Sequence, residues 1–188
     1  MLEVVAAGFG IVSVFLSTRQ IVWSWPTSLV NVSLYAYYFF AQRLYALTLL
    51  QGFFAAVALY GWYEWLHGGR DHGALTVSRI PRRLGLLLAM TAVAGTAILA
   101  FVLDRYTTDP SPGVDGALAV VSLIAQWMMA RKYVENWTIW IGVNCLSVPF
   151  FLLRGEYPTA AQYLVFLVLA ISGYRQWTAT LAAASARP

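Results

Sequence analysis

The stretch LGLLLAMTAVAGTAILAFVL, residues 84–103, contains no charged residue. An α-helix needs about 20 apolar residues to cross the hydrocarbon core of a bilayer, so this stretch predicts a membrane-spanning helix. The composition of the whole chain agrees with this prediction. Of its 188 residues, 60% are hydrophobic and 11% are charged, whereas charged residues make up about 25% of a soluble domain. We therefore expect an all-α integral membrane protein.

Six further apolar segments lie on the two sides of this stretch. They are separated by breaks that contain charged residues, proline or glycine, and they run over 4–18, 25–41, 45–66, 114–130, 137–153 and 160–177. The segments are continuously apolar and do not alternate with a period of two residues, which argues against a transmembrane β-barrel. The sequence therefore predicts seven transmembrane helices.

The breaks differ in charge, and this difference predicts the orientation of the chain. The break HGGRDHGALTVSRIPRR (67–83) is basic, whereas DRYTTDPSPGVD (104–115) is acidic. Cytoplasmic loops carry an excess of lysine and arginine. With the N-terminus outside and the C-terminus in the cytoplasm, most of the basic residues are cytoplasmic, namely Arg19, Arg70, Arg79, Arg82, Arg83, Arg131, Lys132, Arg175 and Arg187.

An internal repeat appears at an offset of about 112 residues. Matched pairs are Glu3 with Asp115, Arg19 with Arg131, Asn31 with Asn144, Tyr45 with Tyr157, Gly61 with Gly173 and Trp65 with Trp177, and we predict that Asn31 and Asn144 occupy equivalent positions. One linking helix restores the direction of insertion, so the halves are parallel, as in transporters whose site lies between the repeats. We predict one domain over 1–188, with repeats at 1–66 and 114–177 and a linker helix at 84–103.

Polar and aromatic residues form a stripe on one face of the segment 137–153. Positions i, i+3 and i+7 share a helix face, and the stripe comprises Trp137, Trp140, Asn144 and Ser147. An unpaired amide in hydrocarbon costs a few kcal/mol, so the stripe should face the interior. Two aromatic planes there can sandwich a flat heteroaromatic ring, and the amide can bond its substituents. Trp137 as an interface anchor and asparagines as links between helices remain open alternatives.

A second stripe lies on the segment 25–41 and comprises Ser28, Asn31, Tyr35 and Tyr38. Gln126 and Gln51 are further candidates for the interior of the bundle. The full set of predicted substrate-binding residues is Trp137, Trp140, Asn144, Asn31, Gln126, Tyr35, Gln51 and Ser28. Trp65 is instead expected to be an anchor at the membrane interface.

No aspartate, glutamate, lysine, arginine or histidine lies in the middle of any predicted span. Proton relays need such residues, so we expect no proton coupling, whereas sodium coupling through carbonyls and hydroxyls stays open. No nucleophile motif, phosphate loop or zinc motif is present. We therefore expect no enzyme, cofactor, metal or nucleic-acid partner. A small aromatic molecule that passes the lipid bilayer without chemistry fits best.

Two long stretches resemble the PnuC family of bacterial vitamin transporters. They are LVNVSLYAYYFFAQRLYALTLLQGFFAAVALYGWYEW (29–65) and ARKYVENWTIWIGVNCLSVPFFLLRGEYPTAAQYLVFLVLAISGYRQW (130–177). The W-x-x-W of Trp137 and Trp140 with Asn144 below it is the most specific part, followed by G-W-Y-x-W at 61–65. The resemblance implies a site lined by these three residues, with Asn31 from the other half.

The resemblance also implies a function. It suggests a homotrimer in the bacterial inner membrane, with seven helices arranged three plus one plus three, similar in shape to SWEET transporters. The cargo would be nicotinamide riboside for NAD biosynthesis, taken up by facilitated diffusion with alternating access and trapped by cytosolic phosphorylation.

Two alternatives to this function remain. Relatives in the family carry thiamine, riboflavin or deoxynucleosides, and likeness at the level of the fold does not decide the cargo. A different class, an intramembrane enzyme or a non-transporting membrane subunit, would need a reactive group inside the bundle. Cys145 is the nearest candidate for such a group.

Overall fold

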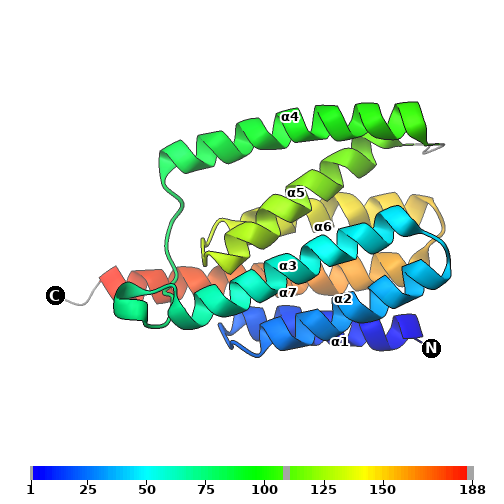
Figure 1. The fold of residues 1–188 in the computed structure, drawn as a ribbon. Helices are drawn as coiled ribbons and strands as arrows, with labels where there is room; N and C mark the ends of the chain where they lie inside the picture. Colours follow the sequence, from blue (N-terminus) through cyan, green and yellow to red (C-terminus); the bar gives the residue numbers. More distant parts are fainter. Residues whose placement is uncertain (1, 108–110, 186–188) are drawn as a thin grey trace.

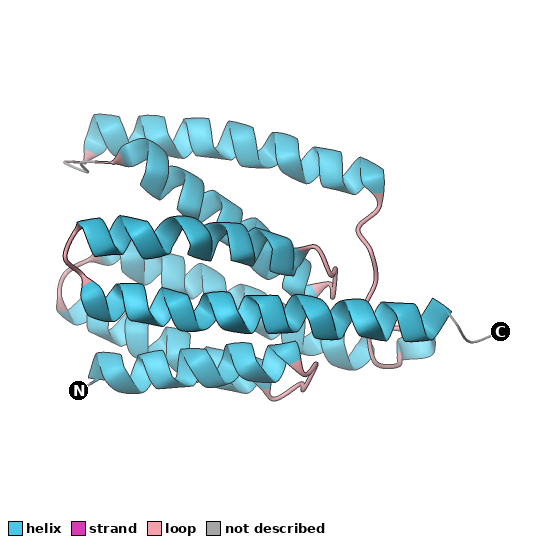
Figure 2. Ribbon diagram, turned by 180° about the vertical axis from the view of Figure 1, so that it is seen from behind, coloured by secondary structure: helices cyan, strands magenta, loops and turns pink. Residues whose placement is uncertain are grey.

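The computed structural model of the chain describes residues 2–107 and 111–185. Within these residues the fold is all helical (Figure 2), as the sequence predicts. The α-helices are α1 (Leu2–Thr18), α2 (Ser24–Ala41), α3 (Tyr45–His67), α4 (Arg82–Tyr106), α5 (Pro112–Ala130), α6 (Asn136–Leu153) and α7 (Tyr157–Ser185), with a short 3-10 turn η1 (Arg70–His72). Each predicted segment coincides with one of the seven α-helices in this part of the chain. Arg187 lies outside the described residues.

Four of these helices could cross a membrane by length and composition, and they are α4, α5, α6 and α7. Helix α1 is apolar over Val4–Thr18 but shorter. Helix α4 has no buried residue, and large apolar side chains such as Leu86, Met90 and Val93 are exposed along it. Exposed apolar side chains at this density fit a lipid environment.

The other six helices close into a ring. Helix α2 packs on α1 and α3, α6 packs on α5 and α7, and the contacts of α1 with α7 and of α3 with α5 complete the circle. Helices α2 and α6 therefore occupy opposite positions in the ring. Helix α4 packs on α5 from outside (Figure 1).

The connections at one end of the bundle are basic, and we call this end the basic end. It comprises the turns 19–23 and 131–135, the connection 68–81 and the C-terminal part of α7 (Figure 1). The N-terminus lies at the opposite end.

Turns that lie 112 residues apart have the same geometry. Helix α1 ends with a hydrogen bond from Ile21 N to the Leu16 carbonyl, and α5 ends with one from Tyr133 N to the Met128 carbonyl, both 3.0 Å. Gln20 and Lys132 have positive φ angles of 58° and 51°. This combination is the Schellman motif, in which a left-handed residue closes a helix end.

Arg43 and Gly155, with φ angles of 61° and 74°, occupy equivalent positions after α2 and α6. The two helices both have 18 residues. The offset of 112 residues therefore applies to the turns at both ends of α2 and α6.

Two tryptophan pairs repeat the same packing. Trp25 meets Trp65 edge to face at a centroid distance of 5.4 Å, and Trp137 meets Trp177 in the same way at 5.4 Å. In each pair a glycine of the neighbouring helix, Gly61 or Gly173, lies against the ring, and an added Cβ would collide with it. Each ring is therefore fitted against bare backbone.

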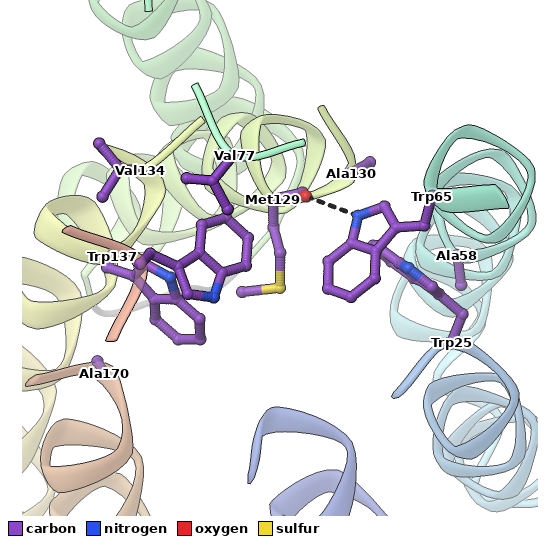
Figure 3. Packing of buried hydrophobic residues seen from close by; sticks show 10 residues of the cluster. Trp25, Ala58, Trp65, Val77, Met129, Ala130, Val134, Trp137 and Ala170 are labelled. Atoms are coloured by element: carbon purple, nitrogen blue, oxygen red, sulfur yellow. Dashed lines mark hydrogen bonds between the residues drawn. The ribbon is translucent and has the colours of Figure 1, made fainter. Parts of the chain in front are cut away.

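The second tryptophan of each pair also joins the two halves of the ring. Trp65 Nε1 donates to the Met129 carbonyl at 3.2 Å, and Trp177 Nε1 donates to the Ser17 carbonyl at 3.1 Å. Figure 3 shows the first bond, with the Met129 side chain between Trp65 and Trp137. Trp65 is only 3% exposed. The prediction of an interface anchor is therefore wrong for Trp65, because its indole fills the core and forms a bond between α3 and α5.

The proposed equivalence of Asn31 and Asn144 is also wrong by one residue. The turns and tryptophan pairs are spaced by 112 residues, so the counterpart of Asn144 is Val32 and that of Asn31 is Val143. One residue turns a helix by about 100°. Accordingly Val32 and Asn144 are both buried, whereas Asn31 faces α1.

Candidate ligand-binding site

Helix α6 carries a polar stripe on its buried face. Asn144 and Ser147 are 2% and 1% exposed, and Trp137 is 1% exposed. Trp140 is half-buried and packs on the same core. Because of their helical spacing, these residues lie on one face of α6. The neighbouring helices of the ring cover this face, whereas the opposite face of α6 is apolar and accessible.

Trp137 is held from two sides near the start of α6. Trp177 meets its ring edge to face, and the backbone of Gly173 on α7 lies against the ring. Its indole Nε1 is buried and has no hydrogen-bond partner among the described residues. The ring is therefore fixed in position while its donor is unused.

Asn144 and Trp140 are linked within the helix. Asn144 Nδ2 donates to the Trp140 carbonyl at 2.7 Å. In the described part of the chain, Trp140 Nε1 and Ser147 Oγ are buried without a hydrogen-bond partner. Buried polar atoms are almost always paired, and leaving one unpaired costs about 1–3 kcal/mol. The stripe therefore contains buried polar atoms whose hydrogen-bonding capacity is unused within the described residues.

The residues predicted on α2 divide into two groups. Ser28 and Tyr35 are half-buried, and Tyr35 stacks on Phe39 at a centroid distance of 5.7 Å. Their positions correspond, at the offset of 112 residues, to Trp140 and Ser147. Asn31 is directed differently, because its Nδ2 donates to the Ala6 carbonyl on α1 at 2.7 Å.

The two glutamines lie on the helices that separate α2 from α6 on one side of the ring. Gln51 on α3 and Gln126 on α5 are both half-buried. The structure therefore gathers Trp137, Trp140 and Asn144 on one helix face and distributes the other candidates over three further helices.

Gly173 and Trp177 shape the site without having been predicted as part of it, and Trp25 repeats the packing of Trp137 in the other half. Gly173 and Trp177 hold the Trp137 ring, and Trp25 is its counterpart in the other half. The signal for Trp25 was its position 112 residues before Trp137.

No cluster of three histidine, cysteine or acidic residues that could hold a metal occurs among the residues with described positions. Cys145, next to Asn144, is exposed on the outer side of α6. The candidate site is thus a set of buried aromatic, amide and hydroxyl groups, several of whose polar atoms have no partner among the described residues.

Comparisons with known proteins point in the same direction. A family model described as nicotinamide mononucleotide transporter matches residues 1–179. The nicotinamide riboside transporter PnuC of Escherichia coli (strain K12) is 30% identical over 201 residues, covering 94% of this chain and 84% of that protein. The riboflavin/roseoflavin transporter RibM of Streptomyces davaonensis is 29% identical over 177 residues, covering 89% and 80%.

A solved structure has a similar fold. The crystal structure of the vitamin B3 transporter PnuC superposes with a TM-score of 0.76 at 27% sequence identity. The match covers 97% of this chain and 82% of that chain.

Proposed function

The chain belongs to the nicotinamide mononucleotide transporter family, and on this premise we propose that it carries nicotinamide riboside across the bacterial inner membrane. The observation that carries the proposal is the α6 stripe of Trp137, Trp140 and Asn144. Fixed aromatic rings, an amide and unpaired indole donors suit a ligand with a flat ring and hydroxyl groups.

The absence of basic residues from the stripe favours the riboside over the mononucleotide. A phosphate group buried in a membrane protein needs arginine, lysine or several N–H donors. The described part of α6 has neither arginine nor lysine. The riboside carries no phosphate, so its transfer avoids that cost.

The proposed architecture is a seven-span transporter with two parallel three-helix repeats and α4 as linker. Its support is the offset of 112 residues in the turns, the tryptophan pairs and the bonds between the halves. Repeat one comprises residues 1–66, the linker 84–103 and repeat two 114–177. This arrangement resembles that of SWEET transporters, and we propose that it assembles as a homotrimer.

The proposed mechanism is facilitated diffusion by alternating access between the two repeats. No aspartate, glutamate, lysine, arginine or histidine lies in the middle of the predicted spans, which favours movement without proton coupling. Cytosolic phosphorylation would then trap the cargo. The excess of arginine and lysine at the basic end supports a cytoplasmic location for this end and an N-terminus outside.

Binding measurements on alanine variants of the site, with an exposed tryptophan as control, test the site. Trp140→Ala and Asn144→Ala should each weaken nicotinamide riboside binding by roughly ten-fold or more, because stacking or a buried hydrogen bond contributes about 1–3 kcal/mol. Trp23→Ala is the control, since Trp23 is 65% exposed. Isothermal titration calorimetry of the purified protein gives the affinities. Wild-type affinity in both Trp140→Ala and Asn144→Ala would refute the site.

Riboflavin is the second candidate cargo, because a riboflavin/roseoflavin transporter is 29% identical to the chain. A panel of nicotinamide riboside, nicotinamide mononucleotide, riboflavin, thiamine and deoxynucleosides separates the alternatives. Tightest binding of nicotinamide riboside supports the proposal, and tighter binding of any other member overturns it.

A further inference from the structure

Two seams join the halves of the ring at the basic end, and they are unequal. The α3–α5 seam contains the bond from Trp65 to the Met129 carbonyl, and the α1–α7 seam contains the bond from Trp177 to the Ser17 carbonyl. These bonds lie at equivalent positions and have nearly equal lengths. What surrounds them differs.

The α3–α5 seam has charged links in addition. Arg131 forms an ion pair with Glu64 at 2.9 Å and bonds the Tyr60 hydroxyl at 3.2 Å. The ammonium group of Lys132 lies over the Trp65 ring, 4.4 Å from its centroid. Lys132 itself is buried. A cation over an indole face is attracted to the ring, so this contact adds to the ion pair across the seam.

An extended segment, residues 75–80, then crosses this seam. We call it the strap. Leu75 N donates to the Trp65 carbonyl at 3.2 Å, and Lys132 Nζ donates to the Leu75 carbonyl at 2.7 Å. Val77 is buried in the tryptophan core. The first half of the strap is thus fastened to α3 and to the turn 131–135 together.

The second half of the strap is fastened to the same turn. Ser78 pairs with the turn through two backbone hydrogen bonds of 3.0 Å, one to the Lys132 carbonyl and one from Val134 N. Ile80 N donates to the Glu135 carboxylate at 3.0 Å. Glu135 directly precedes α6, so the strap joins the start of the site-bearing helix to α3.

Within the described residues, the α1–α7 seam has no ion pair or lysine at the positions equivalent to Glu64, Arg131 and Lys132. Arg19, the counterpart of Arg131, lies over the Phe15 ring of its own helix. Gln176, the counterpart of Glu64, donates to Ser172 within α7. An exposed bond of 3.1 Å from Gln20 Nε2 to Thr180 Oγ1 crosses the seam next to the tryptophan bond. Exposed bonds between neutral side chains exchange readily with water.

We propose that cargo leaves and enters the site at the basic end through the α1–α7 seam, while the α3–α5 seam stays closed as the fixed side of the gate. The inference rests on the proposed transport function. Among the described residues, opening the α1–α7 seam breaks two hydrogen bonds between neutral groups. Opening the α3–α5 seam would in addition separate the Arg131–Glu64 ion pair, lift the Lys132 ammonium from the Trp65 ring and detach the strap.

Paired cysteines across each seam test the assignment. The variants are Gln20→Cys with Thr180→Cys across the α1–α7 seam, and Glu64→Cys with Arg131→Cys across the α3–α5 seam. Both are made in a Cys145→Ala background, because Cys145 is exposed and would react. A short, reducible bifunctional thiol reagent is suited to both pairs, since the native side chains are in contact. Gln20 Nε2 lies 3.1 Å from Thr180 Oγ1, and Arg131 Nη1 lies 2.9 Å from Glu64 Oε2. Uptake of labelled nicotinamide riboside into proteoliposomes is measured before cross-linking, after it and after reduction.

Cross-linking across the α1–α7 seam should lower uptake by roughly ten-fold or more, because it blocks the conformational step that transport requires, and reduction should restore uptake. Cross-linking across the α3–α5 seam should leave uptake within about two-fold of the uncross-linked variant. Unchanged uptake with the α1–α7 seam closed, or blocked uptake with the α3–α5 seam closed, overturns the gate assignment. A lack of riboside uptake by the wild-type protein refutes the transport function itself, so the two failures are distinguishable.

Discussion

The contact between Gly173 and Trp137 predicts the effect of a single methyl group. In Gly173→Ala the new Cβ would lie 2.6 Å from Cε2 and Cζ2 of the Trp137 ring and 2.7 Å from Cδ2, well inside the ordinary carbon–carbon contact of about 3.5–4.0 Å. The ring cannot easily retreat, because it is 1% exposed and Trp177 packs against it.

The expected cost follows from two opposing effects. Overpacking of a filled core costs about 1–3 kcal/mol, and the short contacts place this substitution at the upper end. Alanine is better than glycine in a helix by about 1 kcal/mol. The net loss of stability is therefore about 2 kcal/mol. Displacement of the Trp137 ring should also weaken nicotinamide riboside binding by about five-fold, since stacking contributes on the order of 1 kcal/mol.

Two glycine variants provide matched controls. Gly61→Ala creates the same collision with Trp25 in the other half, and Gly142→Ala on α6 places its methyl group in open space. Thermal melting in detergent reports stability, and calorimetric titration reports affinity. Gly173→Ala and Gly61→Ala should both melt earlier than the wild type, and only Gly173→Ala should lose affinity. Wild-type melting of Gly173→Ala, or equal affinity losses in both variants, would refute the reasoning.

Two further predictions concern the basic end. Trp65→Phe and Trp177→Phe should both lower stability, because each removes an equivalent hydrogen bond between the halves that contributes about 0.5–1.5 kcal/mol. Trp65→Phe should lose more, because it also weakens the contact with the Lys132 ammonium. Thermal melting of the two variants measures this, and an equal or smaller loss in Trp65→Phe would contradict it. Burial lowers the pKa of Lys132 from 10.5 to about 8, so between these values the unfolded chain binds more protons than the folded one and stability rises with pH. The melting temperature of the wild type should therefore increase from pH 8 to pH 10, and a Lys132→Met variant should lack that part of the increase.

Helix positions were predictable because each turn is marked in the sequence by polar residues. The break around Arg19 and Gln20 and the one around Arg131 and Lys132 locate the ends of α1 and α5 correctly. The end of α7 was placed too early, at residue 177, whereas the helix runs to Ser185. The tail TATLAAAS is less apolar, so the hydropathy of the sequence indicates a span that ends before it. Its alanines nevertheless have high helix propensity, and the helix continues through them.

Packing was harder to predict than position. Trp65 was expected at the membrane interface, because a tryptophan near a helix end has the same sequence signature in a lipid belt and in a core. Its burial depends on Met129 and Trp25, which are distant in sequence. The buried face of α6 was predictable from spacing. The direction of Asn31 was not, since an alignment by residue type is wrong by one position and therefore by about 100°.

The strap was not predicted. Residues 75–80 lie in a polar break, and Val77 is a single apolar residue without periodicity. Its role depends on backbone bonds to the turn 131–135, and backbone pairing of this kind leaves little trace in side-chain patterns.

The most direct measurement is uptake of labelled nicotinamide riboside by proteoliposomes that contain the purified protein, without an ion gradient and without a kinase inside. The account predicts that the riboside enters faster than into protein-free vesicles and stops at equal internal and external concentrations, with entry slowed in Trp140→Ala. Entry no faster than into protein-free vesicles, or entry that requires a proton or sodium gradient, would contradict it.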